Sequence, residues 1–359
     1  MESLVKKGAM KRWALLVIFM TAMAVFAGGF NYTIAAAKPT KIRVGAMPYY
    51  LSVPLQVIKD EKLDEKYGFD LEVIGFPSGG PMAEALGAGQ WDIGPIGAGG
   101  MIAIPTYNAK LIGDVELDMD GAWIMARPNS DIVKAGSHFA KYPEVIGSKA
   151  AIKGKTILGT IGNISHYMAL DYIKLFGLGM KDVKFVHMET SQVYTAFVAG
   201  NGDLACIGSP AAGVKLRDQG YKIVGGLKQQ GKSQQDALLV SDKFYKQNYK
   251  DCINFMKAWY RATDKLNGNP EYEVEMTKKF YKLSGRTDFT DAGVREECSW
   301  NTYIDSKNVF QKKTGVWMTG LVKFMVDNKT MDKQVVNAMR TNIKLDIVKD
   351  AIEQLKAEK

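Results

Sequence analysis

The order of apolar and polar runs is repeated in two parts of the chain, at 41–105 and at 153–210. In each part, a short β-type run leads into a helix-compatible stretch and then into a second apolar run. An Ala-rich helix that ends at glycine follows, and each part closes with a Gly-containing strand, at 92–97 or at 203–208. The repeat predicts two β-α-β-α-β units, which would form two small α/β lobes.

The chain is expected to cross between these lobes twice. A strand expected at 121–126 is followed by a Pro-containing turn, where the chain would leave the first lobe. The apolar run at 237–240 predicts a strand that returns to the first lobe. The resulting assignment is lobe I at 38–127 and 237–359, and lobe II at 128–236.

The pattern after Phe244 is helical to the end of the chain. One expected helix has an apolar face at Cys252, Phe255, Met256 and Trp259. We therefore expect a helical C-terminal region attached to lobe I. The predicted fold class is α/β, with two small mixed sheets, each flanked by helices.

The amino terminus has the pattern of a secretory signal peptide. A cationic start is followed by an uncharged apolar run at 13–27 and by small residues up to Ala37, which favours cleavage after Ala37 or after Ala27. An uncleaved membrane anchor is the alternative, because no charge occurs from 13 to 37. No cysteine precedes Cys206, so a lipid anchor is not expected. The expected location is the periplasm.

Charge and the usual chemical motifs argue against several function classes. The formal net charge is +9, and residues 1–37 contribute four positive and one negative side chain, which leaves about +6 for the rest. These charges are mixed in sign and form no basic stripe with aromatics, so nucleic-acid binding is not expected. The three histidines and three cysteines lack metal-ligand spacing, and no serine-hydrolase, Walker or zinc-protease motif occurs. The sequence therefore predicts no enzyme, metal or cofactor, and it leaves open whether two of Cys206, Cys252 and Cys298 form a disulfide.

The loops that follow the predicted strands are rich in small residues. Ligands of α/β sheets bind at the carboxyl ends of the strands, and free amides at a helix start attract anions. These loops supply the candidate ligand-binding residues Ser78, Gly79, Gly97, Ala98, Gly162, Asn163, Ser165, His166 and Ser209. The alternative is that they are plain strand-to-helix turns, which need glycine and capping residues in any case.

Five further residues could line the cleft wall. Tyr49, Tyr50 and Ser52 follow the first strand, and Trp123 lies near the first crossing. Glu189 follows a strand of the second lobe and could meet a ligand ammonium, or it could simply open a helix. For Trp123, packing in the core is an equally good interpretation.

The order and spacing of several segments resemble the extracytoplasmic solute-binding proteins of ABC importers, in the nitrate/sulfonate/taurine-type group. A Pro-Leu helix start follows the first strand, and a Gly-Phe-Asp-Leu-Glu-Val element resembles the family's Gly-Leu-Asp-Val-Glu. Each lobe also contains an Ala-Phe/Leu-x-x-Gly-x-x-Asp block. The matching segments are 52–58, 68–73, 78–97, 152–157 and 196–203.

The resemblance implies a type II periplasmic-binding-protein fold whose two lobes close over a small anionic organic solute. It also implies delivery to an ABC permease in the inner membrane, with no chemistry on the solute. Many relatives carry a Trp in the third strand of the second lobe, where this chain has Ile207-Gly208-Ser209-Pro210. A roomier and more polar pocket is therefore expected, and taurine, other sulfonates, nitrate and carboxylates all remain candidates.

Two alternatives come from other classes of protein. A membrane-anchored sensory receptor would keep the amino-terminal segment. An enzyme related to thiamine-pyrimidine synthesis would rely on a cysteine cluster, which this chain lacks.

Overall fold

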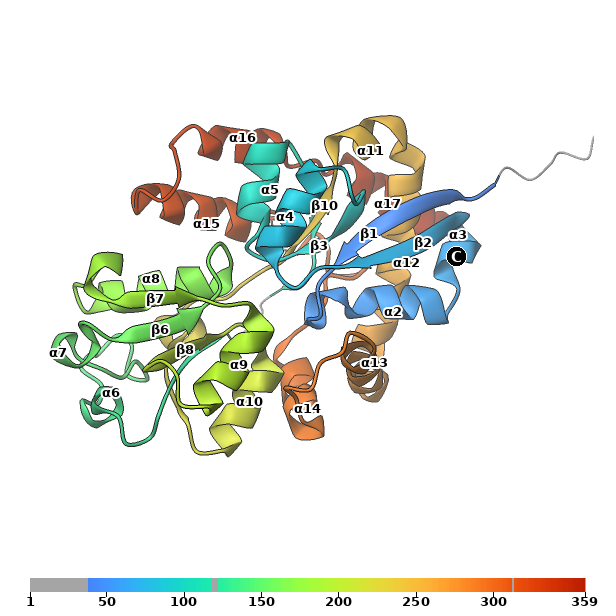
Figure 1. Cartoon of the computed structure of the whole chain (residues 1–359). Coiled ribbons are helices and arrows are strands. Elements are labelled where there is room, and N and C mark those ends of the chain that lie inside the picture. Colours follow the sequence, from blue (N-terminus) through green and yellow to red (C-terminus); the bar gives the residue numbers. More distant parts are fainter. Residues whose placement is uncertain (1–37, 118–121, 312, 359) are drawn as a thin grey trace, which may run out of the picture. The chain divides into compact units, whose positions relative to one another are not determined.

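The computed structural model describes residues 38–117, 122–311 and 313–358. The expected signal segment 1–37 lies outside the described residues. Pro39–Lys359 form one compact unit that contains two five-stranded sheets (Figure 1). We call each sheet with its helices a lobe. Within the described residues, no helix is both long and apolar enough to span a membrane.

The first sheet has the strand order β2-β1-β3-β10-β4. Its first three strands are parallel, and β10 inserts antiparallel between β3 and β4. The return of 237–240 to the first lobe, predicted from the sequence, is confirmed by this pairing. The strands are β1 (Thr40–Ala46), β2 (Phe69–Gly75), β3 (Ile93–Ile96), β4 (Lys110–Asp114) and β10 (Ala237–Val240).

The second sheet repeats this plan with the order β7-β6-β8-β5-β9. Here β5 is the antiparallel insertion, between β8 and β9. The prediction that 121–126 belongs to the first lobe was therefore wrong, and the chain has already crossed before Trp123. An apolar run predicts a buried strand but carries no information about its partner. The strands are β5 (Trp123–Ala126), β6 (Thr156–Gly159), β7 (Lys184–His187), β8 (Leu204–Ile207) and β9 (Lys222–Gly226).

Helices flank both sheets. In the first lobe they are η1 (Tyr50–Ser52), α2 (Val53–Asp60), α3 (Leu63–Tyr67), α4 (Gly79–Gly87) and α5 (Gly100–Tyr107). In the second lobe they are α6 (Asp131–Lys134), α7 (Lys149–Ile152), α8 (Ile164–Leu175), η2 (Met180–Asp182), α9 (Thr190–Val198), α10 (Pro210–Asp218) and η3 (Lys228–Gln230).

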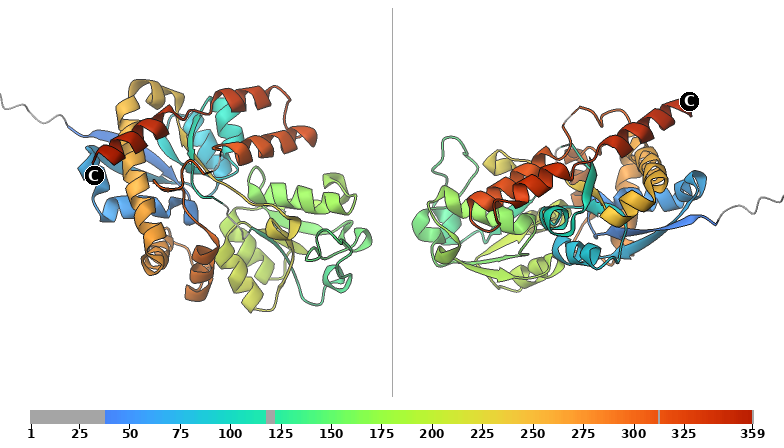
Figure 2. Two further views of the ribbon diagram at one scale, coloured as in Figure 1. Left: turned by 180° about the vertical axis from the view of Figure 1, so that it is seen from behind. Right: turned by 90° about the horizontal axis from the view of Figure 1, so that it is seen from above.

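The C-terminal region is helical, as the sequence predicted. Its longest helix, α12, buries the predicted apolar face of Cys252, Phe255, Met256 and Trp259 against α2, α3 and α17. Figure 2 shows α17 lying across α12 in the view from behind. The helices are α11 (Asp242–Gln247), α12 (Tyr249–Gly268), α13 (Pro270–Leu283), α14 (Asp291–Trp300), α15 (Val316–Asp327), α16 (Val335–Thr341) and α17 (Asp346–Ala357).

Helix α14 also contacts the second lobe, in addition to the expected attachment to the first lobe. It packs against α10 of the second lobe (Figure 1), where Arg217 forms an ion pair with Glu296. The rings of Trp300 and Trp123 lie 5.3 Å apart. The helix also packs against α13, where the Tyr281 hydroxyl donates to Glu297 and the Cys298 thiol lies 3.7 Å from the Thr277 hydroxyl, so α14 contacts helices of both lobes.

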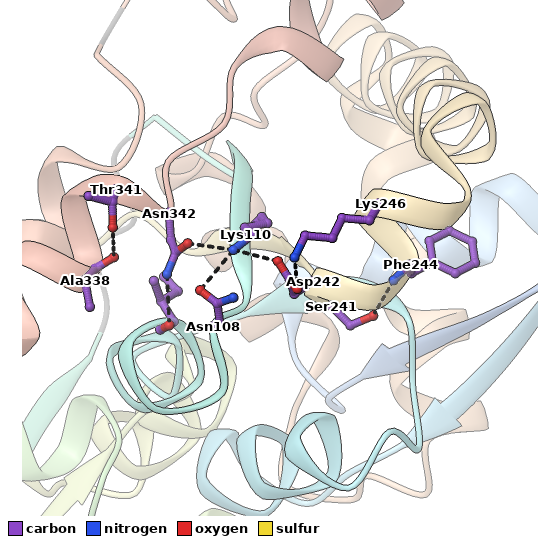
Figure 3. Close-up of polar contacts among 10 residues, drawn as sticks. Asn108, Lys110, Ser241, Asp242, Phe244, Lys246, Ala338, Thr341 and Asn342 are labelled. Carbon is purple, nitrogen blue, oxygen red and sulfur yellow. Dashed lines mark hydrogen bonds and ion pairs between the residues drawn. The ribbon is translucent and has the colours of Figure 1, made fainter.

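A buried lysine joins the edge of the first sheet to the C-terminal segment (Figure 3). The Lys110 ammonium donates to the side-chain oxygens of Asn108 (3.0 Å) and Asn342 (2.8 Å), and it lies 2.9 Å from the Asp242 carboxylate. Backbone bonds of Leu111 with Asn342 and Lys344 continue the same junction. These contacts hold the start of β4 against α11 and against the turn that precedes α17.

The three cysteine thiols are free and buried, so no disulfide crosslinks this fold. Burial raises the pKa of Cys206 and of Cys252 to about 12. The thiols therefore stay protonated at neutral pH and act as small apolar core groups.

Candidate ligand-binding site

Loops from both sheets enclose a small cavity of about 50 Å³, which we call the inner pocket. The first lobe contributes the loops that follow β1, β2 and β3, and the second lobe contributes those that follow β6, β7 and β8. The chain segment that leads into β10 closes the floor. The lining residues are Met47, Tyr49, Leu51, Ser78, Gly79, Gly97, Ala98, Gly99, Asn163, Ile164, Thr190, Gly208, Gln234 and Asp236.

Six of the candidate residues from the sequence line this pocket: Tyr49, Ser78, Gly79, Gly97, Ala98 and Asn163. They lie there because parallel strands of one sheet end at the same edge.

Two glycines bring the loops before α4 and α5 into direct backbone contact. A Cβ atom on Gly99 would lie 2.3 Å from the Gly79 carbonyl oxygen, and a Cβ on Gly79 would lie 3.1 Å from Gly99. Only glycine permits this approach. The starts of both helices are thereby held at the same side of the pocket.

The second lobe places the start of α8 opposite these loops. Asn163 caps the helix, and its Oδ1 accepts from the Ser165 backbone N–H at 2.9 Å. Gly162 has a φ of +78°, which is the left-handed conformation. Its own Cβ position would lie 3.5 Å from Ile102 of α5, so this turn faces the first lobe. Gly162 itself is not among the lining residues.

Tyr50 and Ser52 lie in the core of the first lobe. The buried Tyr50 hydroxyl donates to Glu273, and its ring stacks on Tyr303 with centroids 4.5 Å apart. The Ser52 hydroxyl accepts from the Met47 backbone N–H at 3.1 Å, which stabilises the turn after β1. These side chains support the cleft wall from behind and do not line the inner pocket.

The side chains of three candidates from the second lobe also take part in packing or hydrogen bonds within the protein. Trp123 packs in β5 against Trp300, as in the core interpretation. The Ser165 hydroxyl donates to the Cys206 carbonyl oxygen at 3.3 Å. The Ser209 hydroxyl accepts from the Arg286 guanidinium at 2.7 Å.

His166 and Glu189 lie next to the pocket without lining it. The His166 ring packs on Phe185 at 5.5 Å, and burial lowers the pKa of its imidazole. The Glu189 carboxylate lies 4.0 Å from His187. Glu189 directly precedes α9, which agrees with the interpretation that it opens a helix. The next residue, Thr190, reaches the inner pocket instead.

A larger cavity of about 690 Å³ adjoins the inner pocket, and we call it the outer cavity. Met47 and Tyr49 line both spaces. The outer cavity lies between the first lobe, α9 of the second lobe and the segment that follows α13. Its charged lining residues are Lys59, Lys215, Arg286 and Asp288.

Arg286 contacts both lobes at the wall of the outer cavity. Its guanidinium donates to Asp288 at 2.7 Å, to the Pro48 carbonyl oxygen of the first lobe at 3.3 Å, and to Ser209 of the second lobe at 2.7 Å. It also faces the Tyr281 ring at 4.0 Å. Arg286 follows the end of α13 in a polar break, where no hydrophobic periodicity points to a functional residue.

The floor of the inner pocket contains an acidic group that sequence reasoning missed. Asp236 is buried, its carboxylate accepts from the Gln234 amide, and its backbone N–H donates to Glu116. Burial raises the pKa of Asp236 to about 7 and raises that of Glu116 well above its ordinary value. Asp114 lies nearby in β4, and burial raises its pKa to about 7 as well.

Comparisons with known proteins agree with this geometry. The chain matches the NMT1-like family over residues 35–279. It is 30% identical to a putative ABC transporter periplasmic binding protein of Brachyspira hyodysenteriae. The 318 aligned residues are 89% of this chain and 91% of the relative. It is 24% identical over 210 residues to a putative aliphatic sulfonates-binding protein of Escherichia coli, covering 58% of this chain and 61% of the relative.

Solved structures show the same fold. The alkanesulfonate-binding protein SsuA of Xanthomonas axonopodis pv. citri superposes with a TM-score of 0.67 at 18% identity, covering 86% of this chain and 99% of that one. The nitrate-binding protein NrtA of Synechocystis PCC 6803 gives a TM-score of 0.65 at 15% identity, covering 89% of each chain. The two-lobed periplasmic-binding-protein fold is thus confirmed, and the chain belongs to the NMT1-like family.

Proposed function

We propose that this protein is the solute-binding component of an ABC importer. It captures a small organic solute with an anionic group between its lobes, and it delivers that solute to a permease in the inner membrane. The observation that carries the proposal is the inner pocket, which is built from strand-end loops of both lobes. Its relatives are named as binding proteins, so we assign the chain a role in the periplasm and no catalysis.

The pocket supports recognition of an anionic group through main-chain amides. Gly79 is the first residue of α4, while Gly99 and Asn163 precede α5 and α8. The first amides of a helix have no partner within the helix, and the helix dipole adds a partial positive charge there. The first amides of α5 already donate to the carbonyl oxygens of Gly97, Ala98 and Gly99, so the starts of α4 and α8 are the two that can hold an anion without a full counter-charge.

Closure over the solute follows from the way the lobes are connected. A solute that contacts both lobes binds the closed arrangement better than an open one, and it shifts the population toward closure. The Arg286 contacts to Pro48 and Ser209 add a bridge that exists only when the lobes are together.

Calorimetric titration of the protein with sulfonates, nitrate and carboxylates tests the proposal. We expect at least one of them to bind with a Kd below about 1 mM, the weak limit for a specific solute site. Absence of binding across the whole panel would contradict an anionic solute.

Ala98→Leu should abolish that binding, because the larger side chain fills a cavity of only about 50 Å³. The same change at the exposed Ala357 of α17 is the matched control and should leave binding unchanged. Equal affinities of the two variants would show that the solute binds elsewhere.

A further inference from the structure

The inner pocket has an acidic floor and no basic lining residue among those that the structure describes. Asp236 lies directly beneath the loop that follows β3, since a Cβ on Gly97 would approach its Oδ1 to 3.2 Å. The described residues that line the pocket include no Lys, Arg or His. The only formal charge that a bound solute would meet in this pocket is therefore negative.

Two buried polar atoms at the pocket have unmet hydrogen-bonding capacity. Neither the Ser78 hydroxyl nor the Gln234 carbonyl oxygen has a partner within the described part of the chain. Both residues are at least nine-tenths buried, and both line the pocket. Because the Gln234 amide nitrogen already donates to Asp236, the remaining atom of Gln234 is an acceptor. Leaving such atoms unpaired destabilises the protein, and a solute with N–H donors would satisfy them.

Two further buried carboxyl groups, those of Glu116 and Asp114, lie near Asp236 and favour a positively charged group in the inner pocket. Glu116 accepts the Asp236 backbone N–H through one oxygen, and its other oxygen has no partner among the described residues. Asp114 adds a third carboxyl group, which raises the pKa of Glu116 further. A cation at the pocket would offset the cost of keeping these carboxylates ionised in a buried position.

The sizes of the two spaces limit which part of a solute reaches Asp236. The inner pocket, at about 50 Å³, has room for a small head group. The outer cavity, at about 690 Å³, can hold the rest, and Met47 and Tyr49 line both.

We propose that Asp236, Gln234 and Ser78 form a subsite for a protonated amine, so that the solute is an organic ion with an ammonium head in addition to its anionic group. The ammonium donates to the Asp236 carboxylate, the Gln234 oxygen and the Ser78 hydroxyl. The anionic group lies between the helix starts and the outer cavity. This inference rests on the proposed function and narrows its class of solute.

Matched probes separate the two proposals. We would titrate the protein with 2-aminoethanesulfonate against ethanesulfonate, with 3-aminopropanoate against propanoate, and with ethylammonium alone. The amine-bearing member of at least one pair should bind at least about tenfold more tightly, as expected for hydrogen bonds to a charged group. Equal or tighter binding of the amine-free members would overturn the ammonium subsite and leave the proposed function standing. If ethylammonium bound and no sulfonate or carboxylate did, the result would overturn the proposal of an anionic solute and support the ammonium subsite.

Variants test the residues themselves. Asp236→Asn should remove the preference for the amine, and Ser78→Ala should weaken amine binding about two- to tenfold. The exposed Asp131→Asn is the matched control and should keep the preference. An unchanged preference in Asp236→Asn would overturn the subsite.

A measurement on the unaltered protein covers the case in which Asp236→Asn fails to fold. The preference for the amine should grow between pH 6 and pH 8, because the carboxyl loses its proton near pH 7. The groups that face this carboxyl are Gln234, Glu116 and Asp114, and none of them carries a positive charge. A preference that shrinks as pH rises would show a protonated acid donating to an anion, and it would overturn the ammonium subsite.

Discussion

At the scale of single residues, the pocket depends on the backbone contact between Gly79 and Gly99. Gly99→Ala would place a Cβ atom 2.3 Å from the Gly79 carbonyl oxygen, so the start of α5 must move. We expect a loss of about 1–3 kcal/mol in the free energy of unfolding together with a marked loss of solute affinity. Thermal unfolding and titration with the tightest-binding probe of the panel would measure both.

The neighbouring Gly80 provides the control for this change. A Cβ atom there meets nothing within 4 Å, and the residue is helical. Gly80→Ala should keep the affinity and leave stability unchanged or raised by up to about 1 kcal/mol. If Gly99→Ala behaved like Gly80→Ala, the tight contact between the loops would have no role in forming the pocket.

A second residue-scale prediction concerns pH and the buried Asp114. Burial raises its pKa to about 7, although the Gly315 N–H donates to both of its oxygens at 3.1 Å. In the unfolded chain the pKa is about 3.9, so folding takes up a proton between those values. The stabilisation that this group contributes is fully present at pH values below its pKa in the unfolded chain. It is lost as the pH rises through about 7, its pKa in the folded protein.

The free energy of unfolding should therefore fall between pH 5 and pH 8, and Asp114→Asn should reduce that fall by up to about 2 kcal/mol. Urea denaturation at pH 5, 6, 7 and 8 would measure it. The exposed Asp332→Asn should leave the slope unchanged. A fall of the same size in Asp114→Asn would mean that the carboxyl stays ionised in the fold.

The sequence predicted candidate residues that follow strands, some of which line the inner pocket, but it did not single out Asp236, which precedes a strand. Small residues such as Ser78 and Asn163 come directly after predicted strands, where ligands of α/β folds bind. Asp236 comes before β10, and a residue before a strand ordinarily lies at the opposite edge of a sheet. Because β10 runs antiparallel, with Ala237 opposite Ile96, its start lies at the carboxyl end of β3. Direction of pairing is a tertiary property, and the apolar pattern at 237–240 does not contain it.

At the scale of elements, helix α14 is predicted to behave as part of the second lobe. Trp300, at its end, packs on Trp123 of β5, and the helix lies along α10. Trp300→Ala removes much of this half-buried contact and should cost about 2 kcal/mol locally. In hydrogen exchange, the amides of α14 should lose protection while those of α12 keep it.

Phe310→Ala is the control for this substitution, because Phe310 is an exposed aromatic residue in the same C-terminal region. It should change the protection of neither helix. Uniform loss of protection across α12 and α14 in Trp300→Ala would instead show one cooperative C-terminal unit.

Element types were easier to predict than element partners. The apolar face of α12 could be read directly because its residues repeat at helical spacing, and they are all buried. The same periodicity in α14 shows only that one face is apolar. It packs against both α10 and α13, and nothing local to 291–300 distinguishes those surfaces from the one that α12 covers. Similarly, the apolar run at β5 predicts a strand without indicating its sheet.

At the scale of the whole described unit, the lobes are joined by chain crossings and bridged by side chains. Arg286 is one such bridge, because it donates to Pro48 in the first lobe and to Ser209 in the second. An open arrangement would lose at least one of these hydrogen bonds. Since a solute binds the closed population, the observed affinity falls when that population falls.

Arg286→Met should therefore weaken binding of the tightest probe about tenfold or more, the range expected when a hydrogen bond from a charged group is lost. Small-angle scattering without solute should give a larger radius of gyration for this variant than for the unaltered protein. Arg295→Met is the matched control: Arg295 pairs with Glu271 at 2.5 Å on the surface and joins α14 to α13. Its effect on affinity should stay within about threefold, because exposed ion pairs contribute little. If Arg286→Met lowered the melting temperature but left both the affinity and the radius unchanged, the guanidinium would stabilise the segment around Asp288 and take no part in closure.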